Sequence, residues 1–215
     1  MVRVKGMYEI MAVATRLDEI TAEIAASGMY PRLLLHSCCA PCASYVLEYL
    51  SQFFLITAFF YNPNITPREE YDKRAAEFYK LTSQGGYDNH VDIIICEYDA
   101  TVFTAVAELF PNEPEGGRRC RACFRLRLEE TARVAKEGGY DYFTTTLSVS
   151  PHKNAVMLNE AGAESAGKFG VGYIHSDFKK RDGYKRSVEL SKKYGLYRQE
   201  YCGCESSAQR LVQTL

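Results

Sequence analysis

Five short apolar runs, separated by stretches long enough for a helix, constrain the fold of this chain more than any other feature of its sequence. Uninterrupted apolar runs of this kind are typical of strands that are buried on both faces of a parallel sheet. Strands that alternate with helices indicate an α/β fold. We therefore expect a parallel, doubly wound sheet with helices on both faces. Its strands are predicted at Arg32–His36, Phe53–Tyr61, Val91–Cys96, Tyr142–Leu147 and Val171–His175.

The stretches between these runs carry the signals of helix starts. Pro41 suits the first turn of a helix, Thr66-Pro67-Arg68-Glu69 has the pattern of a capping box, and Asp99 is a suitable N-cap. Helices are therefore expected over residues 40–51, 66–83, 99–110, 120–136 and 183–194, with a further helix that begins at Ser150.

Apolar residues at helical spacing precede the first strand and predict an amphipathic helix. Acidic residues interrupt this stretch, so it resembles neither a signal-peptide core nor a membrane span. We expect a helical extension over residues 1–30 and a single α/β domain over residues 31–215. The apolar positions of the extension are Met7, Ile10, Met11, Val13, Ala14, Leu17, Ile20 and Ile24.

Seven of the eight cysteines fall into three tight clusters. Without a signal peptide we expect a reducing, cytoplasmic setting, where spaced cysteine pairs more often bind metal or do redox work than form structural disulfides. The clusters are Cys38, Cys39 and Cys42; Cys120 and Cys123; and Cys202 and Cys204.

Ligands of open parallel sheets bind beyond the carboxyl ends of the strands, and cysteines are expected at this edge. Cys38 and Cys39 leave the first strand, whereas the loop before Cys120 and residues 148–154 belong at the same edge. The C-terminal tail should fold back to join them. The pairs Cys38/Cys39 and Cys120/Cys123 offer four thiolates, which suit either zinc or an iron–sulfur cluster. Because both pairs lie at predicted helix starts near arginines, their thiol pKa values should be lowered.

The Cys202-Gly203-Cys204 pair has a different chemistry. A disulfide across one intervening residue closes a strained ring that is easily reduced. The pair therefore suits a redox-active disulfide, or it supplies thiolates to a second metal together with Cys42, and the sequence leaves both uses open. Cys96 ends an apolar strand, where a buried, inert thiol is expected.

Three polar side chains are candidates for chemistry on a ligand. His152 lies in the segment Ser150–Asn154, where a helix start and Lys153 could bind phosphate. Asp177 could orient a hydroxyl or an amine, and Tyr184 could stack on a ring or donate a proton. A helix cap with solvated side chains is the structural alternative for the first segment.

The charge balance excludes a broadly basic nucleic-acid binder, because 26 Lys and Arg against 27 Asp and Glu give a net charge of −1. Two local basic groups remain, one around the second cysteine cluster and one after Asp177. Each basic group is either a solvated helix face or an anion-binding patch, and the sequence does not distinguish these two interpretations. They comprise Arg118, Arg119, Arg121, Arg125 and Arg127, and Lys179, Lys180, Arg181, Lys185 and Arg186.

Phosphate-binding glycine motifs are absent from the sequence, which contains neither G-x-x-x-x-G-K-[ST] nor G-x-G-x-x-G. A Ser-Gly-Gly-rich pyrophosphate loop is expected after the first strand in ATP-using sheets of this sort. The turn Cys38–Cys42 stands in its place, so activation of a substrate by ATP is not expected.

Several short motifs occur in a fixed order, and together they resemble the QueH family of epoxyqueuosine reductases from Arg32 to Ser206. The stretch before Arg32 departs from that family, whose members begin close to the first strand. The motifs are His36-Ser37-Cys38-Cys39-Ala40-Pro41-Cys42, Tyr61-Asn62-Pro63-Asn64-Ile65, Cys120-x-x-Cys123, Ser150-Pro151-His152-Lys153-Asn154, Asp177-Phe178-Lys179-Lys180 and Tyr201-Cys202-Gly203-Cys204.

The resemblance implies a nucleotide-hydrolase-like (HUP-type) fold and the last step of queuosine synthesis, in which the epoxide of epoxyqueuosine at the tRNA wobble position is reduced. It implies a [4Fe–4S] cluster on Cys38, Cys39, Cys120 and Cys123. Cys202 and Cys204 would then be a redox pair, or ligands of an adjacent mononuclear iron together with Cys42.

Catalytic and tRNA-binding residues follow from the same resemblance. Asp177, Tyr184 and His152 are the candidates for the acid that protonates the departing oxygen. The electron donor is unidentified, and no membrane partner is expected. Contacts to tRNA are expected from Asn62, Asn64, Arg119, Arg121, Lys153, Asn154, Lys179, Lys180 and Arg181.

Two other functions use the same residues. A non-catalytic RNA-binding module would use the cysteines to hold structural zinc. A tRNA-thiolating enzyme on the same scaffold is disfavoured by the missing pyrophosphate loop.

Overall fold

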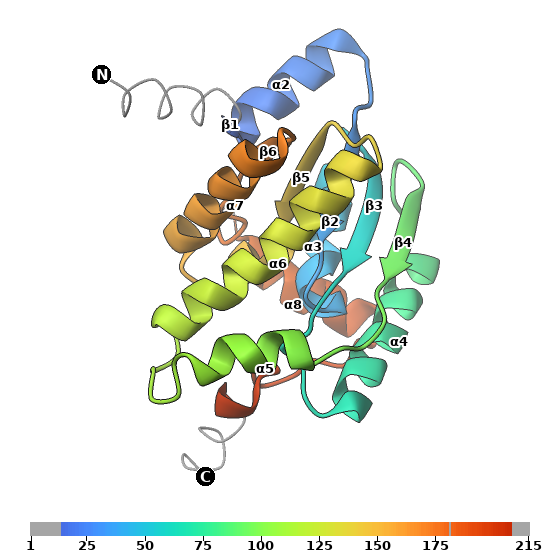
Figure 1. The fold of residues 1–215 in the computed structure, drawn as a ribbon. Helices are drawn as coiled ribbons and strands as arrows, with labels where there is room; N and C mark the ends of the chain where they lie inside the picture. The colour runs from blue at the N-terminus through green and yellow to red at the C-terminus, as the bar shows by residue number, and fades with distance from the viewer. Residues whose placement is uncertain (1–13, 181, 208–215) are drawn as a thin grey trace, which may run out of the picture.

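The protein forms one six-stranded sheet in which every pair of neighbouring strands is parallel (Figure 1). The computed structural model describes residues 14–180 and 182–207. The strand order is β1-β6-β5-β2-β3-β4. The predicted doubly wound α/β fold is confirmed. The strands are β1 (Ala14–Arg16), β2 (Arg32–His36), β3 (Leu55–Phe60), β4 (Val91–Ile95), β5 (Tyr142–Thr145) and β6 (Gly172–His175).

Helices cover both faces of the sheet, and alternate residues of each strand supply the two cores. In β2, Leu33 and Leu35 join the core beneath α3 and α4, whereas Leu34 joins the core beneath α6 and α7. All three leucines are fully buried. The helices are α2 (Leu17–Ser27), α3 (Ala40–Leu50), α4 (Arg68–Gln84), α5 (Thr101–Glu108), α6 (Arg118–Glu137), α7 (Ala155–Phe169) and α8 (Gly183–Lys193), with a 3₁₀ turn, η1 (Thr146–Val149).

The sheet reverses its winding direction at β2, and this reversal positions the site. The chain runs outward from β2 through β3 to β4, then returns to β5 on the other side of β2. Such a switch point opens a crevice at the carboxyl ends of the two central strands. Cys38 follows β2, and η1 follows β5, so both enter this crevice. The backbone amide of Cys38 donates to Thr146 Oγ1 at 3.3 Å.

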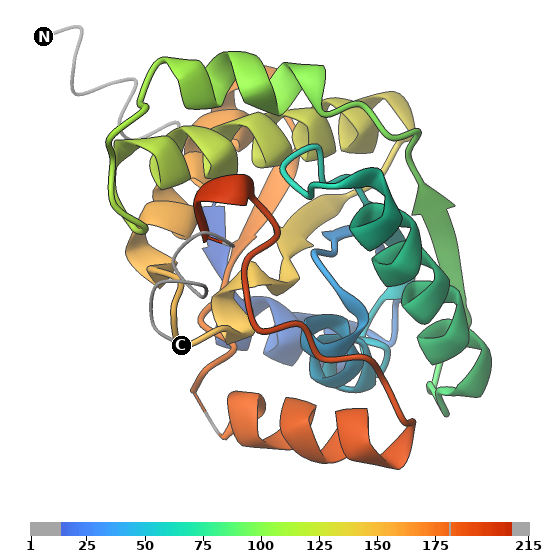
Figure 2. The same cartoon turned by 90° about the horizontal axis from the view of Figure 1, so that it is seen from below.

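The C-terminal tail crosses the carboxyl edge of the sheet, as Figure 2 shows from below. Residues of the β3–α4 loop and of α4 form hydrogen bonds with the backbone of this tail. The amide of Thr66 donates to the carbonyl oxygen of Gly203 at 2.9 Å. Arg74 of α4 donates to the carbonyl oxygens of Cys202 at 3.2 Å and Tyr201 at 3.4 Å. The expected return of the tail to this edge is confirmed.

The N-terminal segment differs from the single helix that its apolar spacing predicts. Ala14–Arg16 forms β1, which pairs with the free edge of β6, and the helix begins only at Leu17. Ile20 and Ile24 of α2 are buried in the core. Residues 1–13, which carry the first half of the predicted helix, lie outside the described residues. The division of the chain at residue 30 stays a prediction.

Three helix starts also differ from the sequence-based expectation. Helix α5 begins at Thr101 with Ala100 as its N-cap, so Asp99 is not its N-cap, contrary to the prediction. The helix expected from Ser150 begins at Ala155, because the Asn154 side chain caps it by accepting from the amides of Val156 and Met157. Helix α4 begins at Arg68 without a side-chain cap, so the predicted capping box does not form.

Candidate active site

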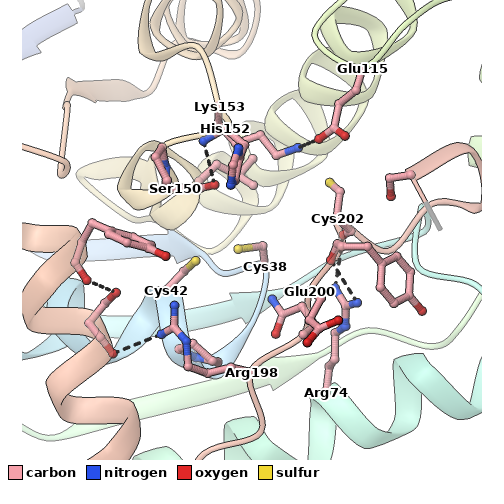
Figure 3. Close-up of a pocket in the computed structure, with 18 of the residues that line it drawn as sticks. Cys38, Cys42, Arg74, Glu115, Ser150, His152, Lys153, Arg198, Glu200 and Cys202 are labelled. Carbon is pink, nitrogen blue, oxygen red and sulfur yellow. Dashed lines mark hydrogen bonds and ion pairs between the residues drawn. The ribbon is translucent and has the colours of Figure 1, made fainter. Parts of the chain in front are cut away.

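A cavity of about 570 Å³ opens at the switch point of the sheet (Figure 3). Segments that are distant in the sequence line it: the turn after β2, helices α4, α6 and α8, the loop before α6, η1 with the loop that follows it, and the C-terminal tail. Cys38, Cys42 and Cys202 all belong to this lining. The other residues used below that line the cavity are Arg74, Glu115, Arg127, His152, Lys153, Tyr184 and Gln199.

Three thiols of the turn after β2 form a compact group. The sulfur atoms of Cys38, Cys39 and Cys42 all lie within 4.8 Å of one another, and those of Cys38 and Cys39 are 3.6 Å apart. Within the described residues, this is the one such group of three metal-ligating side chains. The arrangement follows from local structure, since Cys39 is the N-cap of α3 and Cys42 lies in its first turn.

The three thiols share hydrogen bonds that separate their pKa values. Hydrogen bonds from Cys38 and Cys42 hold the pKa of Cys39 well below its usual range, and Gln199 contributes in the same direction. The same bond to Cys39 raises the pKa of Cys38, and the bond with Cys38 raises that of Cys42. Cys39 is therefore the first thiolate of the group, stabilised by two neighbouring thiol donors.

The second pair, Cys120 and Cys123, lies in the first turns of α6. The amide of Gly116 donates to Cys120 Sγ at 3.2 Å. Burial raises the pKa of Cys120, and it raises that of Cys123 to about 12. Negative charge on Cys202 and Cys204 raises both further, so the tail cysteines lie close to this pair.

The expectation that helix starts and arginines lower all four thiol pKa values is therefore wrong for three of them. It holds for Cys39, where hydrogen-bond donors surround the sulfur. Burial has the largest effect on the pKa values of Cys120 and Cys123, and it raises them because it disfavours the thiolate. Cys38 donates to Cys39 and so retains its own proton. The sequence shows the helix starts but not the depth at which each sulfur is buried.

A buried arginine joins the two thiol groups. Arg127 of α6 is 1% exposed, and its Nη2 donates to Asn62 Oδ1 at 2.5 Å. Its Nε lies 3.3 Å from His36 Nε2, which is also 3.2 Å from the carbonyl oxygen of Tyr61, and His36 Nδ1 bonds Thr145 Oγ1 at 2.8 Å. Burial, followed by the charge of Arg127, lowers the pKa of His36 to about 3 and keeps the ring neutral.

From the sequence alone, Arg127 is one member of a basic group and has no predicted role in the site. A signal was present, because positions 120, 123 and 127 share one face of a helix. The role of Arg74 was missed as well, and nothing in the sequence around it links it to the tail.

Lys153 forms a buried ion pair on the opposite wall of the cavity (Figure 3). Its Nζ lies 3.1 Å from Glu115 Oε1, and its side chain is 7% exposed. The Cys202 side chain acts on the same ammonium group. Burial opposes the charge of Lys153, but Cys202 and Glu115 more than offset this and raise its pKa. Lys153 is therefore a fixed positive charge beside Cys202.

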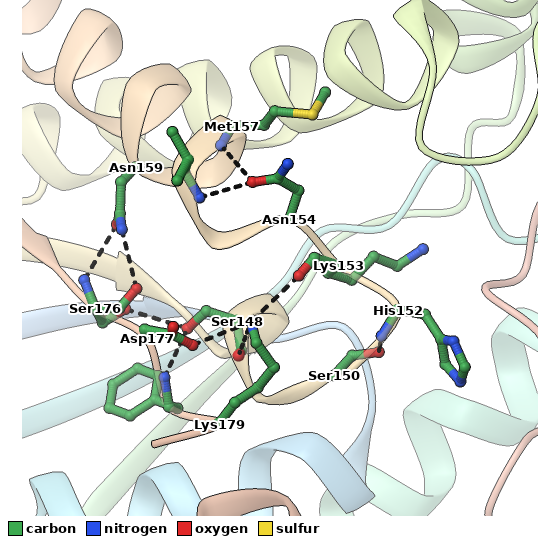
Figure 4. Close-up of polar contacts among 12 residues, drawn as sticks. Ser148, Ser150, His152, Lys153, Asn154, Met157, Asn159, Ser176, Asp177 and Lys179 are labelled. Carbon is green, nitrogen blue, oxygen red and sulfur yellow. Dashed lines mark hydrogen bonds and ion pairs between the residues drawn. The ribbon is translucent and has the colours of Figure 1, made fainter.

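The three candidates for the proton donor are placed differently. His152 and Tyr184 line the cavity. Asp177 lies in a polar network behind the loop after η1, with its Oδ1 3.0 Å from Lys179 Nζ (Figure 4). Lys179 also donates to the carbonyl oxygens of Ser148 and Lys153, which fixes the loop that carries His152.

Most residues expected to contact tRNA have partners within the protein. Asn62 and Asn64 are buried, and Arg119 is buried and donates to the carbonyl oxygen of Phe110. Arg121 pairs with Glu160 on the surface.

The remaining expected tRNA contacts lie around the loop after η1. Lys153 and Lys179 bond within the protein as described, and Asn154 caps α7. Lys180 is exposed, and Arg181 lies outside the described residues. A role in tRNA binding stays a prediction for all of these residues.

An open parallel sheet with a thiol-lined cavity at its switch point defines a class: a cysteine-rich α/β protein equipped to bind a metal centre. The sequence profile described as "Epoxyqueuosine reductase QueH" matches residues 33–210. The chain therefore belongs to the QueH family.

Individual relatives agree with this assignment. A protein of Streptococcus pyogenes named epoxyqueuosine reductase QueH is 44% identical over 83% of this chain and 71% of its own length. Its namesake from Staphylococcus epidermidis is 43% identical over 90% and 83% of the two chains. Its namesake from Thermotoga maritima is 37% identical over 80% and 88%. Across the described ranges of the present structure, none of the helices is both long and apolar enough to cross a membrane.

Proposed function

We propose that this protein reduces epoxyqueuosine to queuosine at the wobble position of tRNA. The observation that carries the proposal is the convergence of cysteines from two distant segments, the turn after β2 and the C-terminal tail, on one cavity, in a chain that belongs to the QueH family. Removal of the epoxide oxygen as water, with formation of the carbon–carbon double bond, consumes two electrons and two protons. The site must therefore supply both a reductant and an acid.

A [4Fe–4S] cluster fits the donor set at this edge of the sheet. Such clusters are held by four cysteine thiolates, and here Cys38, Cys39, Cys120 and Cys123 would hold it. Cys39 and Cys123 are buried, Cys38 and Cys120 are partly exposed, and Arg127 brings a positive charge into the same interior. When bound, the cluster would supply the electrons for the reduction.

The position of Cys42 determines whether it could be a ligand of a second metal ion. Sequence analysis joined Cys42 to Cys202 and Cys204, but its sulfur lies within 4.8 Å of Cys38 and Cys39. Cys42 and Cys202 both line the cavity, so a mononuclear iron between them would face the substrate. The alternative is a redox-active Cys202–Cys204 disulfide, with the positive charge of Lys153 beside Cys202.

His152 is the proton donor that the site favours. It lines the cavity, and the loop that carries it is held by Ser150 and Lys179. An imidazolium is a much stronger acid than a phenol, so His152 suits the role better than Tyr184 does. Tyr184 is half-exposed at the cavity mouth, where its ring can stack on the substrate base.

Entry of a modified base into the cavity requires the base to leave the anticodon loop. The exposed Lys180 and the arginines at the surface of α6 would then contact the phosphates. With a tRNA substrate, a cytoplasmic reaction is part of the proposal. The proximal electron donor would be a low-potential protein or reductant that reaches the cluster from outside the cavity.

The test is a single-turnover reaction under anaerobic conditions. Iron-loaded protein is incubated with tRNA that carries epoxyqueuosine and with a low-potential reductant, and the nucleosides are analysed by mass spectrometry. The expected product has lost one oxygen atom. Full retention of the epoxide by loaded protein contradicts the proposal. Tight tRNA binding by a colourless zinc protein would instead support the non-catalytic RNA-binding module.

A further inference from the structure

Arg127 is the most deeply buried cation of the described residues, and its hydrogen-bond partners Asn62 and His36 are neutral. It is 1% exposed, yet no ion pair among the described residues includes it. By contrast, the buried guanidinium of Arg74 pairs with Glu70 at 2.7 Å. An unpaired buried charge is costly, and proteins normally pair it or neutralise it. Arg127 therefore needs an anion that the neighbouring side chains do not provide.

The neutral partners of Arg127 hold it in place rather than compensate its charge. Asn62 accepts from Arg127 and donates to the carbonyl oxygen of Ser37 at 2.9 Å, so it ties the guanidinium to the turn before Cys38. His36 Nε2 lies 3.3 Å from Arg127 Nε, and the ring is kept neutral. These hydrogen bonds fix the positive charge of Arg127 in the space between β2 and α6.

The thiols on both sides of that space respond to this charge. Burial raises the pKa of Cys123, and Arg127 is the largest influence in the opposite direction, through its charge and through a hydrogen bond. Its charge also lowers the pKa of Cys38, against the hydrogen bond to Cys39 that raises it. Arg127 thus lies between the two thiol pairs and acts on a member of each.

We propose that Arg127 is the counter-charge of the metal centre held by the two thiol pairs, and that it sets the reduction potential of that centre. This inference rests on the proposed function, because it assumes that Cys38, Cys39, Cys120 and Cys123 hold a [4Fe–4S] cluster. Four thiolates give such a cluster a net negative charge, which increases on reduction. A buried positive charge favours the more negative state, so it raises the potential.

Arg127 is a positioning residue in this account, because it acts on the substrate only through the cluster. The experiment compares Arg127→Met, which keeps the aliphatic bulk without the charge, with Arg127→Lys, which keeps the charge without the planar fork. Arg119→Met is the matched control. Arg119 lies on the same helix and is 5% exposed, but it donates to the carbonyl oxygen of Phe110.

Two properties are measured on each purified protein, free of metal and after anaerobic loading. The first is the increase in melting temperature on loading, and the second is the one-electron equilibrium of the loaded protein with a redox dye. In Arg127→Met, we expect a smaller increase in melting temperature and a reduction equilibrium at least tenfold less favourable, equivalent to 59 mV. Arg127→Lys should lie within threefold of the wild type, and Arg119→Met should leave both properties unchanged.

Each outcome is decisive. If Arg127→Met destabilises metal-free and loaded protein equally and leaves the dye equilibrium unchanged, Arg127 serves only its bonds to Asn62 and His36, and the inference is wrong. If Arg127→Met takes up no cluster, the Arg127→Lys variant decides the question. A loaded Arg127→Lys protein with a reduction potential near the wild-type value supports the counter-charge role. Failure of Arg127→Lys to take up the cluster shows that the planar guanidinium, rather than its positive charge, is required. Wild-type protein that takes up no iron and sulfide would refute the proposed cofactor itself.

Discussion

The backbone amide of Thr66 donates a hydrogen bond of 2.9 Å to the carbonyl oxygen of Gly203, and this bond attaches the cysteine tail to the loop after β3. Gly203 has φ +115°, a conformation that residues with a side chain rarely adopt. A Cβ atom there would lie 2.9 Å from Ile65 and 3.1 Å from Arg74. The attachment of Cys202 and Cys204 therefore depends on a glycine between them.

Replacement of that glycine should release the tail. Gly203→Ala should cost roughly 1–3 kcal/mol of local stability, because the backbone must change or the neighbours must move. We expect more than a tenfold loss of turnover with the cluster colour retained. Gly86→Ala is the control, because no atom lies within 4 Å of its added Cβ and the position has ordinary φ. Equal activity of the two variants would show that the tail conformation is not required.

Cysteines of the two thiol sets should have different roles. Cys120→Ser should abolish the visible absorption of anaerobically purified protein, because it removes one proposed ligand of the cluster. Cys204→Ser should keep that absorption but lower turnover, because Cys204 is not among the four proposed ligands. Absorption spectra and iron content distinguish the two. Loss of all iron in Cys204→Ser would show that the separation of roles is wrong.

Surface arginines of α6 should contribute to tRNA binding according to their position along the helix. Arg121, near the carboxyl edge of the sheet, pairs with Glu160, and Arg133, near the other end, pairs with Glu130 and Glu137. Such exposed pairs contribute at most about 1 kcal/mol to stability. Arg121→Ala should weaken tRNA binding and reduce the slope of log K against log salt by about one.

Arg133→Ala is the matched variant for that measurement, because it removes the same charge from the same helix. Its affinity and salt slope should equal those of the wild type. Equal salt slopes for Arg121→Ala and the wild type would remove Arg121 from the tRNA contact surface.

The pH dependence of stability should reveal the thiol of Cys96. Burial raises its pKa to about 11 from an ordinary 9.0. Between these values the folded state retains a proton that the unfolded state has lost, so stability is full below about pH 9 and falls as the pH rises toward 11. The loss should be about 2 kcal/mol, reduced from the ideal value by partial exposure.

Denaturant unfolding of metal-free protein at several pH values measures this dependence. Cys96→Ala should lose stability less steeply between pH 9 and 11 than the wild type does. Parallel curves for the two proteins would assign the alkaline loss to other groups, such as Tyr71, whose pKa burial also raises.

The regular part of the fold follows from the sequence, because apolar runs such as Leu33–Leu35 leave few alternatives to a buried parallel strand. The strand Ala14–Arg16 could not be predicted, since a three-residue strand carries no periodicity and is fixed by pairing with β6. The helix start at Ala155 depended on the side chain of Asn154, which sequence analysis assigned to tRNA.

Site residues could be predicted where the residue type itself indicates the chemistry, as it does for the cysteines. Cysteine clusters indicate a shared centre, and the edge of the sheet on which they meet follows from strand order. The depth at which a side chain is buried cannot be read from the sequence. For this reason the predicted direction of the Cys123 pKa shift was wrong. For the same reason Asn62 was predicted to bind the substrate. Asn62 instead connects Arg127 to the turn before Cys38.

Metal analysis of anaerobically purified wild-type protein tests the central claim most directly, because that claim is the convergence of Cys38, Cys39, Cys120 and Cys123 on one iron–sulfur centre. Iron and acid-labile sulfide should both be present, with iron at least equal to sulfide, and with broad visible absorption that is lost in Cys39→Ser and in Cys123→Ser alike. Stoichiometric zinc without sulfide, or visible absorption that survives the loss of either thiol pair, would contradict it.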